Sequence, residues 1–170
     1  MAKIDKLNDK PSLLFNSQLE TGIRSLVILE AAYPDSYDLN KLTWLDHLVV
    51  HTGDISGPAS LHPKLPQRSG EMLVRRRLIE EGLILMRRFH LINAITDSKG
   101  ISYQATDEAY VITRHMRTEY SQALIERAKW VVEQFSSFSD YELRDFIIQK
   151  IGRWNIEFQE KSITLKDDNK

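Results

Sequence analysis

The stretch EMLVRRRLIEEGLILMRRFHLINAITDSKGISYQA, residues 71–105, decides the fold. Apolar residues recur in it at helical spacing up to about Phe89, which predicts a helix over 71–89. Two short segments with alternating pattern, 91–96 and 101–105, follow this helix. The residues Asp97 to Gly100 between them suit a tight turn, so the stretch predicts a helix followed by a β-hairpin.

Two further helices are expected before this stretch. Apolar residues at helical spacing from Ser17 predict a first helix that ends near Ala32, because Pro34 cannot continue it. Asn40 is a plausible N-cap for a second helix that ends before Gly53. Three helices and a hairpin, in this order, are typical of a winged helix.

Additional helices are expected after the hairpin. Thr106 and the acids that follow it predict a helix toward Met116, and two more helices should cover 120–135 and 139–151, the last capped by Ser139. The expected fold class is therefore mostly α, with a winged-helix-like core (three helices plus a β-hairpin wing) and additional C-terminal helices.

The same patterns predict four parts of the chain. Residues 1–16 form a flexible N-terminal arm, 17–116 a winged-helix-like domain, 117–161 a C-terminal helical extension and 162–170 a polar tail. At 170 residues, one well-buried core with an extra helical layer is the expectation.

The composition limits the function classes. Lys and Arg total 23 against 24 Asp and Glu, so net charge gives no pull toward nucleic acid or anionic membranes. Cysteine is absent, which excludes disulfides and thiolate metal sites. The N-terminal segment lacks the apolar core of a signal peptide, and no apolar run approaches the roughly 20 residues that span a bilayer. We expect a cytoplasmic protein with no membrane contact.

A local basic region is the first candidate site. Residues 64–90 hold seven Lys or Arg and three Glu. Glu80 and Glu81 lie four residues after Arg76 and Arg77, so i,i+4 pairing partly neutralises the basic stripe. The alternatives are a solvated face or contacts to phosphate groups or a partner protein. The residues expected to make nucleic-acid or partner contacts are Lys64, Arg68, Arg76, Arg77, Arg87 and Arg88.

Arg75 differs from its basic neighbours. On a helical wheel it falls on the mostly apolar arc of the 71–89 helix. A guanidinium there keeps its charge and needs an oxygen partner. We expect it to pair internally with Asp46 or Asp54.

Histidines form the second candidate site. His47 and His51 are four residues apart, a spacing that can share a metal ion, but HLVVH lacks the glutamate of the HExxH pattern. An acid/base pair of Asp46 and His51 has no visible nucleophile or oxyanion donor. The favoured interpretation is a structural hydrogen-bond network that fixes the proline-rich loop 53–70 against the second helix. The residues expected to form this network are Asp46, His51, Asp54, Ser60, His62 and Arg75. No catalytic residue, metal site or cofactor is expected.

Several segments together resemble a known family, the middle component, type 2, of the ABC-three-component systems. The resemblance covers about residues 17–135. Its segments are RSLVILEAAYP (24–34), LDHLVVHTGD (45–54), SLHP (60–63), GEMLVRRRLIEEGLILM (70–86), GISYQATDEA (100–109) and ERAKW (126–130).

In Lamassu-type antiphage defence, this small subunit accompanies an SMC-like ATPase and an effector. The resemblance implies a non-enzymatic adaptor that docks on the SMC-like ATPase subunit and restrains an effector subunit, a nuclease or other toxic enzyme, until foreign DNA is sensed. It also implies that double-stranded DNA is met through the complex and that ATP hydrolysis belongs to the partner.

Two other hypotheses stay open at this point. A stand-alone winged-helix transcriptional regulator would place the 71–89 helix in the major groove as a dimer. Such DNA-binding domains usually have an isoelectric point above about 9, whereas this chain has one of about 6.5. A metal-dependent enzyme would need stoichiometric metal.

Overall fold

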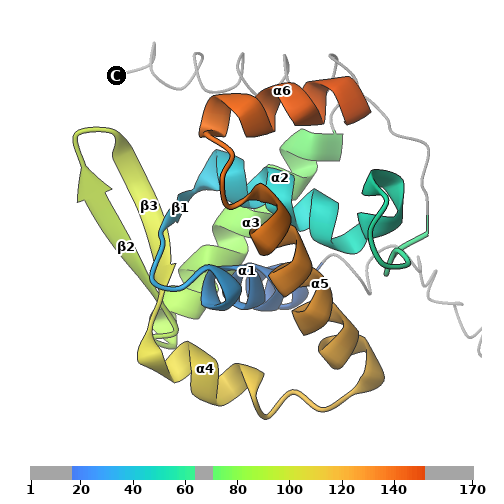
Figure 1. Cartoon of the computed structure of the whole chain (residues 1–170). Helices are drawn as coiled ribbons and strands as arrows, with labels where there is room; N and C mark the ends of the chain where they lie inside the picture. The colour runs from blue at the N-terminus through green and yellow to red at the C-terminus, as the bar shows by residue number, and fades with distance from the viewer. Residues whose placement is uncertain (1–16, 64–70, 152–170) are drawn as a thin grey trace, which may run out of the picture.

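The computed structural model describes residues 17–63 and 71–151. In this part of the chain, helices pack around a central helix and a small antiparallel sheet projects from one side (Figure 1). The elements are α1 (Gln18–Ala32), β1 (Tyr37–Asp38), α2 (Leu39–Val50), the 3₁₀ helix η2 (Thr52–Ile55), α3 (Glu71–Arg88), β2 (Ile92–Asp97), β3 (Gly100–Ala105), α4 (Asp107–Thr113), α5 (Glu119–Phe135) and α6 (Asp140–Ile151). The expected class, mostly α with a β-hairpin after the third long helix and more helices behind it, is confirmed.

The first two helices begin with side-chain caps. Ser17 Oγ accepts a hydrogen bond from the Glu20 N–H and caps α1, which ends at Ala32 as the sequence predicts. The expected cap of α2 was wrong: Asp38 caps it, because Asp38 Oδ1 accepts from the Lys41 N–H at 2.7 Å. Asn40 lies inside the first turn of α2.

The hairpin lies where the sequence predicts it. β2 and β3 pair antiparallel from Ile92 opposite Ala105 to Asp97 opposite Gly100. Gly100 has a φ of 123°, a conformation that an L side chain rarely adopts, so glycine suits the end of this tight turn. The sequence did not predict β1, which adds a third strand on the β3 side through Tyr37 and Tyr103.

The helices after the sheet depart from expectation in one place. Thr106 precedes α4, but its hydroxyl donates to the His90 carbonyl at 2.8 Å instead of accepting from the helix. α4 ends at Thr113, short of the expected Met116. The predicted cap of α6 is confirmed, since Ser139 and Glu142 exchange reciprocal hydrogen bonds in a capping box.

α1 is the centre of the core. It contacts α2, α3 and α5, and its residues 26–29 have no exposed surface at all. A helix that is apolar around its circumference belongs in the middle of a protein. The core cluster also takes in residues of α5 and α6, including Leu124, Val131 and Leu143.

Trp44 is 6% exposed in this core, and the Trp130 ring packs directly over Gly57, where an added Cβ would lie 2.5 Å from it. Trp154 lies outside the described residues. Among the helices described here, none combines the length and hydropathy needed to cross a bilayer.

Candidate functional site

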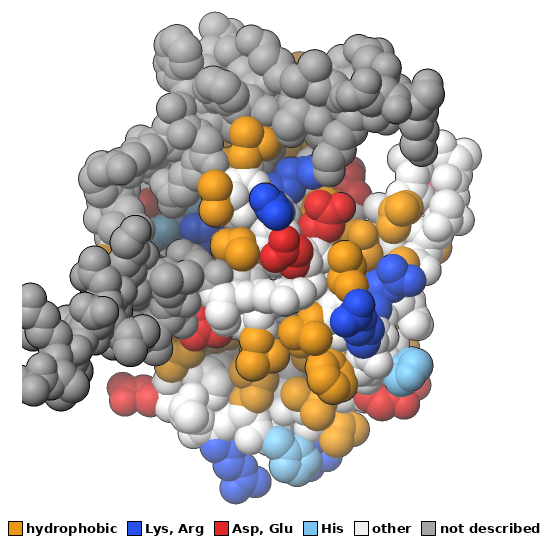
Figure 2. All heavy atoms as spheres, turned by 180° about the vertical axis from the view of Figure 1, so that it is seen from behind, with side chains coloured by type: hydrophobic (Ala, Val, Ile, Leu, Met, Phe, Trp, Pro, Cys, Tyr) orange, Lys and Arg blue, Asp and Glu red, His pale blue; other side chains and the backbone are white. Residues whose placement is uncertain are grey.

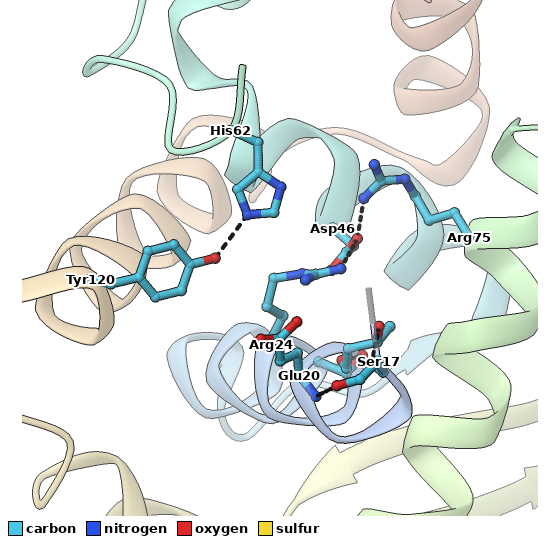
Figure 3. Close-up of polar contacts among 9 residues, drawn as sticks. Ser17, Glu20, Arg24, Asp46, His62, Arg75 and Tyr120 are labelled. Carbon is cyan, nitrogen blue, oxygen red and sulfur yellow. Dashed lines mark hydrogen bonds and ion pairs between the residues drawn. The ribbon is translucent and has the colours of Figure 1, made fainter. Parts of the chain in front are cut away.

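A buried carboxylate joins three helices. Asp46 of α2 is fully buried and lies between Arg24 of α1 and Arg75 of α3 (Figure 3). Arg24 Nε donates to Asp46 Oδ1 at 2.7 Å and Arg24 Nη2 to Oδ2 at 3.2 Å, while Arg75 Nη1 donates to Oδ2 at 2.5 Å. The structure thus brings Arg75 to the first of the two partners that the sequence suggests.

The charges of this cluster stabilise one another. Burial alone would raise the pKa of Asp46, but Arg24 and Arg75 outweigh that effect and hold the pKa at about 2. The carboxylate is therefore ionised at every physiological pH. Because each oxygen already accepts from a guanidinium, Asp46 is a poor general base.

Histidines continue the cluster toward the surface. The His47 and His51 ring centroids are 4.7 Å apart, and the His51 and His62 centroids are 6.4 Å apart. His62 Nε2 lies 2.9 Å from the hydroxyl of Tyr120 on α5 (Figure 3). Burial and the charge of Arg75 lower the pKa of His47 to about 3, and burial and Arg24 lower the pKa of His62 to about 4. Both rings are neutral near pH 7.

The loop after α2 is fixed on both sides. The Leu61 and His62 N–H groups donate to the Val50 carbonyl, at 3.0 and 3.1 Å. Ser60 Oγ accepts from the Gly53 N–H at 3.0 Å, and Arg127 Nε of α5 donates to the Ala59 carbonyl at 2.8 Å.

The expected network members are thus not all in one place. His51 and His62 lie beside the Asp46 cluster, and Ser60 fixes the loop. Asp54 is exposed in η2, and its N–H donates to the His51 carbonyl at 3.0 Å. In the part of the chain that the structure describes, no cluster of three or more His, Cys, Asp or Glu is arranged to hold a metal ion.

The basic residues of α3 divide into engaged and exposed members. Arg77 pairs with Glu81 at 3.3 Å, the predicted i,i+4 geometry. Arg76 does not pair with Glu80: its Nε donates to Asn40 Oδ1 at 3.3 Å, because the residue faces α2. Arg87 and Arg88 are exposed in the last turn of α3. Lys64 and Arg68 lie outside the described residues.

Sequence reasoning assigned no role to two members of the cluster. Arg24 stands within the otherwise apolar run of α1 and is 3% exposed. A buried guanidinium needs a carboxylate partner. This rule predicts a partner for Arg75 and applies equally to Arg24. Tyr120 gives no such signal, since a tyrosine fits the apolar stripe of an amphipathic helix and this one is 39% exposed.

The described residues define a small helical protein with a β-hairpin, whose central ionisable groups cross-link its helices. The family model of the ABC-three component (ABC-3C) system Middle Component 2 matches residues 14–157. The chain belongs to this family and is an accessory component of an ABC-three-component system. No curated protein and no solved structure is significantly similar to it.

Proposed function

We propose that the chain is a non-catalytic adaptor that docks on the SMC-like ATPase of its system and bridges it to the effector, a nuclease or other toxic enzyme, as in Lamassu-type antiphage defence. The observation that carries this proposal is the family match over residues 14–157, because a middle component functions with other components. In this proposal, ATP hydrolysis and damage to the target belong to the partners.

The central cluster supports a role without catalysis. Asp46 is saturated by two guanidinium groups, and His47 is buried and neutral near pH 7. A catalytic pair needs a nucleophile and a base within reach of a substrate. These groups instead face one another between α1, α2 and α3, where they serve the fold.

The surface supports docking. α3 exposes Val74 by 62% and Ile84 by 46%, and Phe89 just after it by 61%. Figure 2 shows hydrophobic side chains gathered in the lower half of one face, with Lys, Arg and His at its margins. A gathered apolar patch with a polar border, like the one in Figure 2, is typical of surfaces that another protein covers, and the exposed apolar residues of α3 are separate candidates for such contacts.

Co-purification tests the adaptor role. The tagged chain, expressed together with the SMC-like ATPase proposed as its partner, should retain that ATPase through size-exclusion chromatography. The variants Val74→Asp and Ile84→Asp should weaken retention, because each introduces a charge on the exposed face of α3 without touching the core. Tyr141→Ala, on the exposed side of α6, is the matched control and should retain the partner. A chain that elutes alone beside an intact ATPase would refute the adaptor role.

DNA contact is the second point to test. Arg87 and Arg88 are the exposed cations of α3 best placed for phosphate contacts, whereas Arg77 shares its charge with Glu81. We propose that DNA is met only in the complex, and expect the isolated chain to show no salt-sensitive shift of duplex DNA.

A stand-alone regulator would behave differently. It would shift duplex DNA alone, and Arg87→Glu with Arg88→Glu would abolish that shift. That result would show that the chain is a DNA-binding regulator and would refute the adaptor role.

A further inference from the structure

We propose that a cavity between the C-terminal end of α1 and the start of α4 binds an arginine side chain of a partner protein. The cavity measures about 460 Å³. Residues of α1, β3 and α4 and of the segments beside them line it: Glu30, Tyr33, Ala105, Thr106, Asp107 and Tyr110. The proposal rests on the adaptor role only in requiring a protein partner.

The charge of the lining selects a cation. Glu30 and Asp107 are its ionisable carboxylates, and no Lys or Arg is among the described lining residues. In the described part of the chain, neither carboxylate forms an ion pair or a side-chain hydrogen bond, so both are available to a ligand. α1 ends here without a basic residue in its last turn, and α4 begins here, so the dipoles of the two helix ends offset each other and the selection of a cation rests on the two carboxylates.

The aromatic residues favour a planar cation. Tyr33 is 54% and Tyr110 57% exposed, so each can present its ring to an incoming group. A guanidinium stacks on such rings while donating to carboxylates in fixed geometry, which an ammonium does less well. The Arg114 guanidinium lies over the Tyr110 ring at 5.6 Å from the centroid, so an incoming guanidinium would have to share this ring with Arg114 or displace it.

The surroundings indicate a protein rather than a free small molecule. Next to Tyr110 on α4, Val111 is 51% and Ile112 45% exposed. Apolar side chains beside a charged cavity provide the contact area that a peptide segment needs around an anchoring arginine. An anchor of this kind would place a partner against α4.

A titration of the isolated full chain tests the site. N-acetyl-arginine amide is added to ¹⁵N-labelled protein and amide shifts are followed by NMR. Shifts should concentrate at residues 30–33 and 105–110. N-acetyl-citrulline amide has nearly the same shape without the charge, and should bind at least fivefold more weakly. Equal binding of the two probes, or shifts spread elsewhere, would overturn the proposal.

Matched variants sharpen the result. Asp107→Asn and Tyr110→Ala should each weaken the binding of N-acetyl-arginine amide about two- to fivefold, as expected for the loss of one exposed cation contact. Glu108→Gln and Val111→Ala change neighbours outside the cavity lining and should leave binding unchanged. If the control variants lost as much affinity for the probe as the cavity variants, the proposed arginine site would also be overturned. Because this titration needs no partner, it can fail while co-purification with the ATPase succeeds, and the reverse.

Discussion

At the residue scale, Asp46 is fully buried and accepts hydrogen bonds from two guanidinium groups. It ties α1 and α3 to α2, since Arg24 and Arg75 both end on its oxygens. Removing three charges from water costs about as much as their attraction returns, so the cluster adds little net stability. The cluster instead fixes how α1, α2 and α3 pack on one another, because its charges are paired only when the helices are placed in this way.

Asp46→Asn should be strongly destabilising. The amide keeps the size of the carboxylate but leaves two buried guanidinium groups without a counter-charge, which costs about 3–5 kcal/mol of unfolding free energy. Urea denaturation followed by far-UV circular dichroism measures the loss. Glu81→Gln is the control, because its exposed pair with Arg77 contributes at most about 1 kcal/mol. Similar losses in both variants would contradict the structural role of the cluster.

His47 makes stability depend on pH. Burial and Arg75 lower its pKa from 6.5 to about 3 in the folded protein, so between these values the unfolded chain binds the extra proton. This contribution to stability is complete above pH 6.5 and is lost as the pH falls toward 3. His62 acts in the same direction.

His47→Gln should therefore flatten the fall in stability below pH 6.5. The slope should decrease by up to about 1.4 kcal/mol per pH unit, the free energy of one proton. Urea denaturation at intervals between pH 7 and pH 4.5 measures it, and a part of the slope should remain because of His62. His115→Gln, at an exposed position, should keep the wild-type slope. If His47→Gln kept that slope as well, His47 would have to be protonated in the folded protein.

The residue scale also shows how far sequence reasoning reaches. That Arg75 needs a partner follows from helical periodicity, because the wheel places it among apolar residues. The choice of Asp46 over Asp54 depends on how α3 crosses α2, which one sequence does not reveal. For the same reason Arg76 reaches Asn40 in place of Glu80.

At the element scale, two glycines set the contact between α1 and α3. A Cβ on Gly82 would lie 2.6 Å from the Gly22 backbone nitrogen, and one on Gly22 would lie 2.9 Å from the Gly82 carbonyl oxygen. Real Cβ atoms do not approach backbone so closely. The helices can therefore meet at this distance only without side chains at both positions.

Gly82→Ala should consequently destabilise the protein, although alanine is the better helix former. Overpacking costs about 1–3 kcal/mol against the roughly 1 kcal/mol gained in helix propensity, so we expect a net loss of up to about 2 kcal/mol. Thermal unfolding measures it. Val74→Ala, on the exposed side of the same helix, should change stability by less than about 0.5 kcal/mol. A more stable Gly82→Ala protein would show that α1 can move away at little cost.

Element boundaries were predictable where local chemistry sets them. Ser139 caps α6 as expected, α1 begins just after Ser17, where the periodic pattern starts, and Gly100 ends the hairpin turn. β1 could not be predicted, because its two residues carry no periodicity and pair with β3 only through the tertiary fold. The cap by Asp38, in contrast, has a local signal, because Asp is as favoured at an N-cap as the asparagine expected there, Asn40.

At the scale of the whole molecule, α5 and α6 belong to the same core as the helices before the hairpin. The core cluster around α1 includes residues of both helices that are at most 2% exposed: Leu124 and Val131 of α5 and Leu143 of α6. The amphipathic pattern of 120–135 predicts which face is buried but not which helices cover it. We propose that the described residues of the predicted parts 17–116 and 117–161 unfold together, despite the separate limits that their sequence patterns suggest.

Leu124→Ala tests this cooperativity. The cavity should cost about 2–5 kcal/mol, and the loss should reach α1 and α3 because Leu124 packs in their common core. Native-state hydrogen exchange measures it residue by residue, and the opening free energies of amides in 26–29, 79–83 and 128–131 should fall by the same amount. Tyr141→Ala, at a position 69% exposed, should leave all three unchanged. If only the amides of α5 lost protection, the C-terminal helices would be a separate unit that opens on its own, and a partner could then displace them without unfolding the helices around Asp46.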